Sequence, residues 1–143
     1  MNRTAFLVSV ALVGATSLGC SGDPASGTGT SFPAAAFTTL QSGSGAYTIE
    51  VRTAPDQPPG REVLSVEYRV TGKDGQPVDG LSVTVLPWMP EMGHGASITP
   101  AVTAKGGGRY VVSDVELFMP GKWELRTTLG PTSDSATPAF QIP

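Results

Sequence analysis

The chain has 143 residues, which is enough for one domain of ordinary size. Its formal net charge is −3 at pH 7, and its nine basic residues form no patch or stripe, which excludes the electrostatic footprint of a nucleic-acid-binding protein. Its one cysteine, Cys20, excludes an internal disulfide, so the core alone must stabilise the fold.

The first residues have the pattern of an export signal. Arg3 supplies a positive charge, and residues 5–15 form an apolar run that is too short to span a bilayer as a mature helix. The run leads to Leu18-Gly19-Cys20, which resembles a bacterial lipoprotein signal, whose cysteine is acylated and becomes the first mature residue. We therefore expect a lipoprotein-type signal peptide over residues 1–19 and a lipid on Cys20.

Ordinary secretion with a chance cysteine is the alternative, and either reading places the protein outside the cytoplasm. By the usual bacterial sorting pattern, Ser21 in place of Asp favours the outer membrane. We expect the lipid on Cys20 to anchor the chain there, facing the periplasm. A thiol that is acylated cannot bind a metal.

Residues 20–45 are predicted to be a flexible tether. They are rich in Ser, Gly, Ala, Thr and Pro and carry one charge, Asp23. Such a composition buries too little apolar surface to offset the entropy of ordering it. We expect the folded domain to comprise residues 46–143.

From Ala46 onward, apolar and polar residues alternate with the period of two that is typical of strands. The phase of this alternation shifts near Ser113-Asp114, which predicts a β-bulge. No helical periodicity occurs after the signal. About seven short strands separated by turns favour an immunoglobulin-like antiparallel β-sandwich, with strands expected over residues 47–52, 64–71, 81–85, 98–104, 109–118, 123–129 and 140–142.

One stretch interrupts this pattern: Pro87-Trp88-Met89-Pro90-Glu91-Met92-Gly93-His94-Gly95. Its density of Pro and Gly disfavours both a regular helix and a central strand, so it is predicted to be a shaped loop. A second phrase, Phe118-Met119-Pro120-Gly121-Lys122-Trp123, resembles it downstream.

No catalytic constellation is present. The chain has one histidine, and no serine or cysteine lies in a recognisable nucleophile context. Glu116 and Glu124 are expected on solvated faces of strands, and Gly106-Gly107-Gly108 lacks the lysine and helix of a phosphate-binding loop. We expect a protein that is not an enzyme.

The remaining chemistry lies in soft donors, namely Met89, Met92, His94 and Met119. Thioethers favour Cu(I), and imidazole suits copper in either oxidation state. Met92-Gly93-His94 places two donors in a glycine-flanked loop, and loops and strand ends gather at the edges of a sandwich, where Met119 is expected. These residues are candidate metal ligands.

Trp88 or Trp123 could shield such an ion and offer its ring to the cation. The alternatives stay open at this point: methionines commonly fill gaps in cores, Trp123 begins an alternating strand and suits the core, and a lone histidine in a loop is commonly exposed.

The chain resembles the YtkA-like domain family over about residues 47–142. The resemblance rests on the loop of residues 87–95, on Gly108-Arg109-Tyr110 and on Val115-Glu116-Leu117-Phe118-Met119-Pro120-Gly121-Lys122-Trp123-Glu124-Leu125. The most specific part of the resemblance is the combination of two motifs, Met-Pro-x-Met-Gly-His at residues 89–94 and Met-Pro-Gly-x-Trp at residues 119–123.

This family is similar to the FixH-like proteins, which are associated with copper delivery during the assembly of respiratory oxidases. The resemblance implies an exported or membrane-anchored immunoglobulin-like sandwich, with Met92, His94 and Met119 at motif positions and Met89 and Trp123 beside them. The lipoprotein-like start replaces the transmembrane helix of the FixH-like proteins, which leaves the oxidase-assembly role without support from the sequence.

Two functions follow as expectations. The first is a lipid-anchored, non-catalytic carrier or buffer of copper, as Cu(I), that exchanges the ion with a donor or acceptor protein. The second is a structural or interaction module of the envelope without a metal, in which Trp88, Met89 and Pro90 form an apolar contact surface. The oligomeric state is not determined by the sequence.

Overall fold

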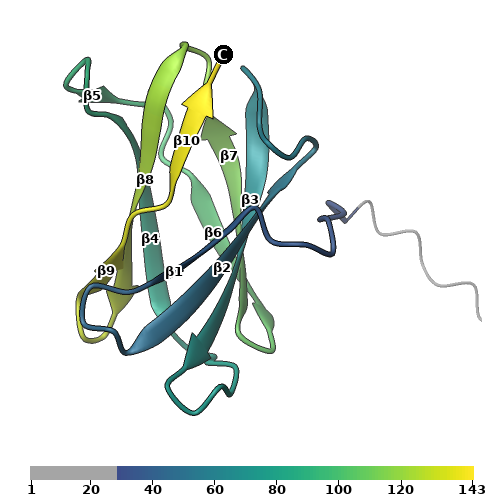
Figure 1. The fold of residues 1–143 in the computed structure, drawn as a ribbon, viewed down its shortest axis with the longest axis vertical. Coiled ribbons are helices and arrows are strands. Elements are labelled where there is room, and N and C mark those ends of the chain that lie inside the picture. The colour runs from purple at the N-terminus through teal and green to yellow at the C-terminus, as the bar shows by residue number, and fades with distance from the viewer. Residues whose placement is uncertain (1–28) are drawn as a thin grey trace, which may run out of the picture.

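The computed structural model describes residues 29–143, which form an antiparallel β-sandwich (Figure 1). The predicted signal peptide and Cys20 lie outside these residues. Within residues 29–143, no helix is long and apolar enough to cross a membrane. The strands are β1 (Thr38–Gln41), β2 (Tyr47–Ala54), β3 (Val63–Gly72), β4 (Ser82–Met89), β5 (His94–Gly95), β6 (Ala101–Gly106), β7 (Arg109–Glu116), β8 (Gly121–Gly130), β9 (Asp134–Ala136) and β10 (Ala139–Ile142).

The strands are divided between two five-stranded sheets. The first sheet has the order β1-β2-β3-β7-β6, and the second has the order β10-β8-β4-β5 with β9 also paired to β8. The predicted all-β sandwich is thereby confirmed. The additional strands are β1, β5 and β9, each no longer than four residues, which carry too little alternation for the sequence pattern to predict.

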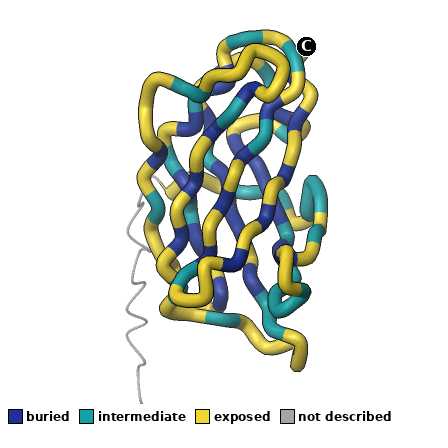
Figure 2. Tube along the Cα trace, turned by 90° about the vertical axis from the view of Figure 1, so that its left-hand side faces the viewer, coloured by how far each residue is buried: buried dark blue, intermediate teal, exposed yellow. Residues whose placement is uncertain are grey.

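The core fills the space between the sheets. Buried and exposed residues alternate along the strands (Figure 2). A buried hydrogen bond of 3.0 Å joins Tyr68 Oη on β3 to Thr127 Oγ1 on β8, and so connects the two sheets. Because burial raises the pKa of Tyr68, the phenol stays protonated. The Thr127 hydroxyl lies 3.1 Å from the Leu125 carbonyl, to which it can donate in turn.

The predicted bulge lies in β7. Leu64 pairs with Val115 and Val66 pairs with Val112, so β7 contains one more residue than β3 between these two pairs. Asp114, one of the intervening residues, has a φ of 60°. The extra residue shifts the alternation by one position, so that Val115 and Leu117 again face the core, as the phase shift in the sequence predicts.

The N-terminal boundary of the folded region differs from the predicted one. Residues 38–41 were expected in the tether, but they form β1 and pair with β2. Phe37 stacks on Phe140 of β10 with ring centroids 5.2 Å apart, and its N–H donates to the Val51 carbonyl over 2.7 Å. The strand ladder and this aromatic contact hold a segment that is too short for its own alternation to predict a strand.

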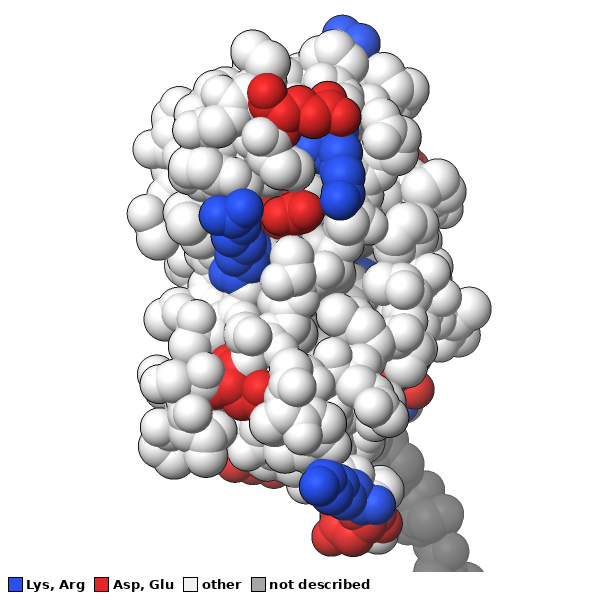
Figure 3. Space-filling view, turned by 60° about the vertical axis from the view of Figure 1, so that its left-hand side comes forward, with Lys and Arg blue, Asp and Glu red and all other residues white. Residues whose placement is uncertain are grey.

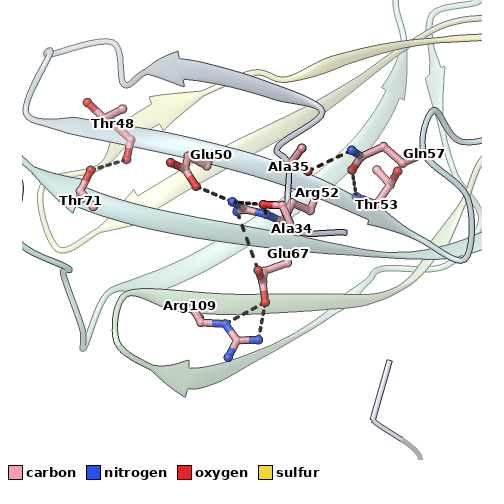
Figure 4. Close-up of polar contacts among 10 residues, drawn as sticks. All are labelled: Ala34, Ala35, Thr48, Glu50, Arg52, Thr53, Gln57, Glu67, Thr71 and Arg109. Atoms are coloured by element: carbon pink, nitrogen blue, oxygen red, sulfur yellow. Dashed lines mark hydrogen bonds and ion pairs between the residues drawn. The ribbon is translucent and has the colours of Figure 1, made fainter. Parts of the chain in front are cut away.

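The chain before β1 is held on the outer surface of the first sheet by Arg52 (Figure 4). The guanidinium of Arg52 donates from Nε and Nη2 to the Ala34 carbonyl over 3.3 and 3.2 Å, and Nη2 also pairs with Glu50 over 2.7 Å. Glu67, beside Arg52 on β3, accepts from Nε and Nη2 of Arg109 over 2.8 and 2.6 Å. Arg52 Nη1 also lies 3.9 Å from Glu67 Oε1, so the buried charges of Arg52 and Glu67 have partners of opposite sign on their own or adjacent strands.

The predicted loop over residues 87–95 is shorter than expected. Residues 87–89 continue β4 and residues 94–95 form β5, which leaves only residues 90–93 as a turn. Pro87 is tolerated because its carbonyl accepts from Ala96 N–H, on the side of β4 away from β8. In an antiparallel strand the N–H and C=O of one residue point to the same side, so Pro87 removes no hydrogen bond from the β4–β8 ladder.

Candidate metal-binding site

A pocket of about 260 Å³ lies where the chain passes from the second sheet to the first. It is bounded by β5 and the segment that follows it, by the end of β7, and by the connection into β8. β5 lies near the same end of the sandwich as the C-terminus (Figure 1). The lining residues are His94, Gly95, Ala96, Ser97, Glu116, Phe118, Met119 and Trp123.

The tight turn after β4 determines where His94 lies. The Met89 carbonyl accepts from the N–H groups of Met92 and Gly93 over 3.3 and 2.9 Å, and Gly93 has a φ of 68°. The reversal pairs Met89 with His94 and Trp88 with Gly95. A Cβ on Gly95 would lie 2.8 Å from the Pro87 carbonyl oxygen, so glycine is required for this close return.

His94 is exposed at the pocket, and one of its ring nitrogens is already engaged. Nδ1 lies 3.1 Å from the carbonyl oxygen of Gly95. Because a carbonyl only accepts, Nδ1 carries the proton in this hydrogen bond, which leaves Nε2 as the ring nitrogen that could bind a metal. Metal-binding histidines are commonly oriented in this way by a hydrogen bond to the other nitrogen.

Met119 is half-buried and packs against the core on the other side of the pocket. Its carbonyl accepts from Trp123 Nε1 over 2.9 Å. Trp123 is only 2% exposed and faces inward, so it forms part of the pocket wall and fixes the backbone that carries Met119. Trp123 is therefore a core residue as well as a pocket residue.

The other two methionines have different environments. Met92 is 62% exposed on the turn and does not line the pocket. Met89 is 2% exposed within the core, and its Cε would lie 3.0 Å from a Cβ on Gly121. Met89 thus packs the turn after β4 against the start of β8, a structural role that leaves its sulfur away from solvent.

Trp88 lies on the outer face of the second sheet and does not line the pocket. The guanidinium carbon of Arg126 lies 4.8 Å from the centroid of its ring. Glu124 in turn pairs with Lys122 and Arg126. Figure 3 brings this side of the molecule forward and shows acidic and basic side chains interspersed on it, without a patch of one sign.

Glu116 also lines the pocket, although sequence reasoning assigned it to a solvated strand face. It is the last residue of β7 and is half-buried. Its place at the pocket depends on the segment of residues 94–97 crossing beside the end of β7. No local sequence pattern indicates that crossing. The only feature of the sequence that could have identified Glu116 as a pocket residue is its position three residues before Met119.

The donors at this site are chemically mixed. No group of three or more His, Cys, Asp or Glu side chains suited to a metal occurs in residues 29–143. The pocket instead combines an imidazole, a thioether and one carboxylate. Imidazole and thioether fit the preferences of Cu(I), and Met92 on the adjacent turn offers a further thioether.

Comparison with known families gives one match: the YtkA-like family model matches residues 39–128. The matched region includes all of β1 except Thr38, the turn after β4 and the whole pocket. No curated protein and no solved structure matches the chain.

Proposed function

The chain belongs to the YtkA-like family. From this membership and from the donors of the pocket, we propose that the protein is exported and non-catalytic, and that it binds copper as Cu(I) and carries or buffers it. The observation that carries the proposal is that His94 and Met119, 25 positions apart in the sequence, line one pocket.

The proposed ligands are His94, through Nε2, and the sulfur of Met119. Met92 is the candidate for a third ligand, because it is exposed on the turn and only Gly93 separates it from His94. Met89 and Trp88 are assigned no part in binding, since one packs in the core and the other lies on the outer face. A site with two or three ligands leaves a position open for a donor or acceptor protein.

The location of the protein is part of the proposal. The basic, apolar start and the Leu18-Gly19-Cys20 sequence support export and a lipid on Cys20. The lipid would hold the domain at the outer membrane, facing the periplasm. A copper donor or acceptor protein of the envelope is the proposed partner.

Competition for Cu(I) tests the proposal. The full chain carrying Cys20→Ser, which removes the thiol as a ligand, is titrated anaerobically against a chromogenic Cu(I) chelator. Loss of an outer-shell partner typically weakens metal binding about 10- to 100-fold, so loss of a ligand in His94→Ala or Met119→Leu is expected to weaken it at least about tenfold.

Met89→Leu is the matched control, because it removes a thioether from the core rather than from the pocket. It should leave the Cu(I) affinity unchanged. The proposal fails if wild type does not compete with the chelator, or if His94→Ala competes as well as wild type.

A second function, an interaction module of the envelope without a metal, is favoured by a different observation. Phe118 is 53% exposed at the pocket, and Met92 and Ile98, on the flanking segments, are 62% and 49% exposed. Partner-binding surfaces commonly expose large apolar side chains of this kind. This function is supported if wild type binds no Cu(I) and Phe118→Ser abolishes a chemical cross-link to an envelope protein.

A further inference from the structure

Of the four glutamates that lie within the described strands, Glu116 is the one that forms no ion pair. Glu50, Glu67 and Glu124 each pair with arginine or lysine. Glu116 forms no such ion pair within residues 29–143, although it is half-buried and lines the pocket with His94 and Met119. Its negative charge is therefore available to a cation in the pocket.

The three side chains suit different oxidation states of copper. Thioether sulfur favours Cu(I), whereas Cu(II) favours nitrogen and oxygen donors. The attraction of a carboxylate for an ion also scales with the charge of the ion, so it doubles from Cu(I) to Cu(II). Imidazole nitrogen is a suitable ligand for both.

We propose that Glu116 makes this pocket a site for copper in either oxidation state. His94 is the ligand common to both, Met119 favours Cu(I), and the carboxylate of Glu116 favours Cu(II). This assignment rests on the proposed copper function and deepens it: the protein retains Cu(II) as well as Cu(I), so its cargo is not limited to the reduced ion.

Separate titrations with the two ions test this assignment. The full chain carrying Cys20→Ser is titrated anaerobically with Cu(I) against a Cu(I) chelator, and in air with Cu(II) against an amino-acid chelator. Glu116→Gln is expected to weaken Cu(II) binding at least tenfold while changing Cu(I) affinity less than threefold. Met119→Leu is expected to have the opposite selectivity.

Glu124→Gln is the matched control, since Glu124 pairs with Lys122 and Arg126 and does not line the pocket. It should change neither affinity. The electron paramagnetic resonance spectrum of bound Cu(II) adds a readout of the ligand set, because replacing a carboxylate ligand by an amide changes the hyperfine splitting.

The outcomes separate the two proposals. If wild type binds neither ion, the copper function fails and this assignment fails with it. If wild type binds Cu(I) but Glu116→Gln leaves both the Cu(II) affinity and the spectrum unchanged, only the assignment of Glu116 is overturned. Should Glu116→Gln not fold, Glu116→Asp keeps the charge on a shorter side chain and is expected to weaken Cu(II) binding alone.

Discussion

The indole N–H of Trp123 donates a hydrogen bond to the carbonyl oxygen of Met119 over 2.9 Å. Trp123 belongs to β8 and is buried between the sheets, whereas Met119 lies on the connection that enters the strand. The bond therefore links the rigid core directly to the backbone of a proposed ligand. It also satisfies a buried donor that would otherwise cost free energy.

Trp123→Phe tests whether this bond positions Met119. The substitution keeps an aromatic ring in the core but removes the N–H, so the Met119 methyl group should become more mobile and Cu(I) affinity should fall. Methyl NMR of the apo protein and the Cu(I) competition provide the two measurements. The loss of the hydrogen bond is expected to cost about 1 kcal/mol of stability, in addition to the cost of the smaller ring.

Leu129→Val, at the other end of β8, is the control for this experiment because Leu129 is 1% exposed and does not line the pocket. It should lower stability by about 1 kcal/mol without changing the Met119 methyl signal. An unchanged methyl signal and affinity in Trp123→Phe would show that Trp123 has only a packing role.

Tyr110 fixes the connection between β3 and β4. Its buried hydroxyl donates to the Val78 carbonyl over 2.9 Å and accepts from Leu81 N–H over 3.0 Å. Tyr110→Phe leaves both backbone groups without this partner, so we expect a loss of about 1–3 kcal/mol in the free energy of unfolding. Chemical denaturation measures it, with Tyr47→Phe on the half-buried Tyr47 as the control that should change stability little.

Gly108, in the turn between β6 and β7, has no room for a side chain. Its φ is 72°, and a Cβ there would clash with the Val70 carbonyl oxygen and lie 3.0 Å from both Pro77 Cβ and Val78 N. Gly107 has a φ of 62° with open space around it. Gly107→Ala should therefore cost about 1–2 kcal/mol from the backbone conformation alone, and Gly108→Ala about 1–3 kcal/mol more from overpacking. Thermal unfolding of the two variants separates the cost of the backbone conformation from the cost of the clash. Equal losses of stability in the two variants would contradict the clash at Gly108.

Asp134 makes stability depend on pH. The hydroxyls of Ser42 and Ser44 and the backbone N–H groups of Ser44 and Ser135 hold the pKa of its carboxyl well below its usual range. A folded-state pKa that is lowered adds stability above the unfolded pKa of about 3.9, and this stability is lost as the pH falls below it.

Urea denaturation between pH 7 and pH 3 measures this contribution. Asp134→Asn should lower the midpoint at pH 7 and reduce its fall toward pH 3, because the variant has no carboxylate to protonate. Asp56→Asn, on an exposed residue, is the control. A pH profile of Asp134→Asn parallel to that of wild type would contradict the assignment.

The sequence by itself determined the sandwich class, the family and the bulge in β7. Each of these depends on local alternation of apolar and polar residues or on a contiguous motif. The long strands β2, β3 and β8 were predictable because one face of each is buried along its length. The predicted tether ended at residue 45 and so included all of β1 (Thr38–Gln41), because that strand is held by pairing with β2 and by the stacking of Phe37 on Phe140 rather than by its own pattern.

Only the tertiary structure decided which of the soft donors lie together. Met89 and Met92 are both candidate ligands in the sequence, yet the tight turn after β4 directs Met89 into the core and leaves Met92 exposed. Glu116 joins His94 and Met119 because the segment after β5 crosses from one sheet to the other beside the end of β7. Such contacts join residues far apart in the chain, and the direction of a side chain within a turn depends on backbone geometry that residue type alone does not fix.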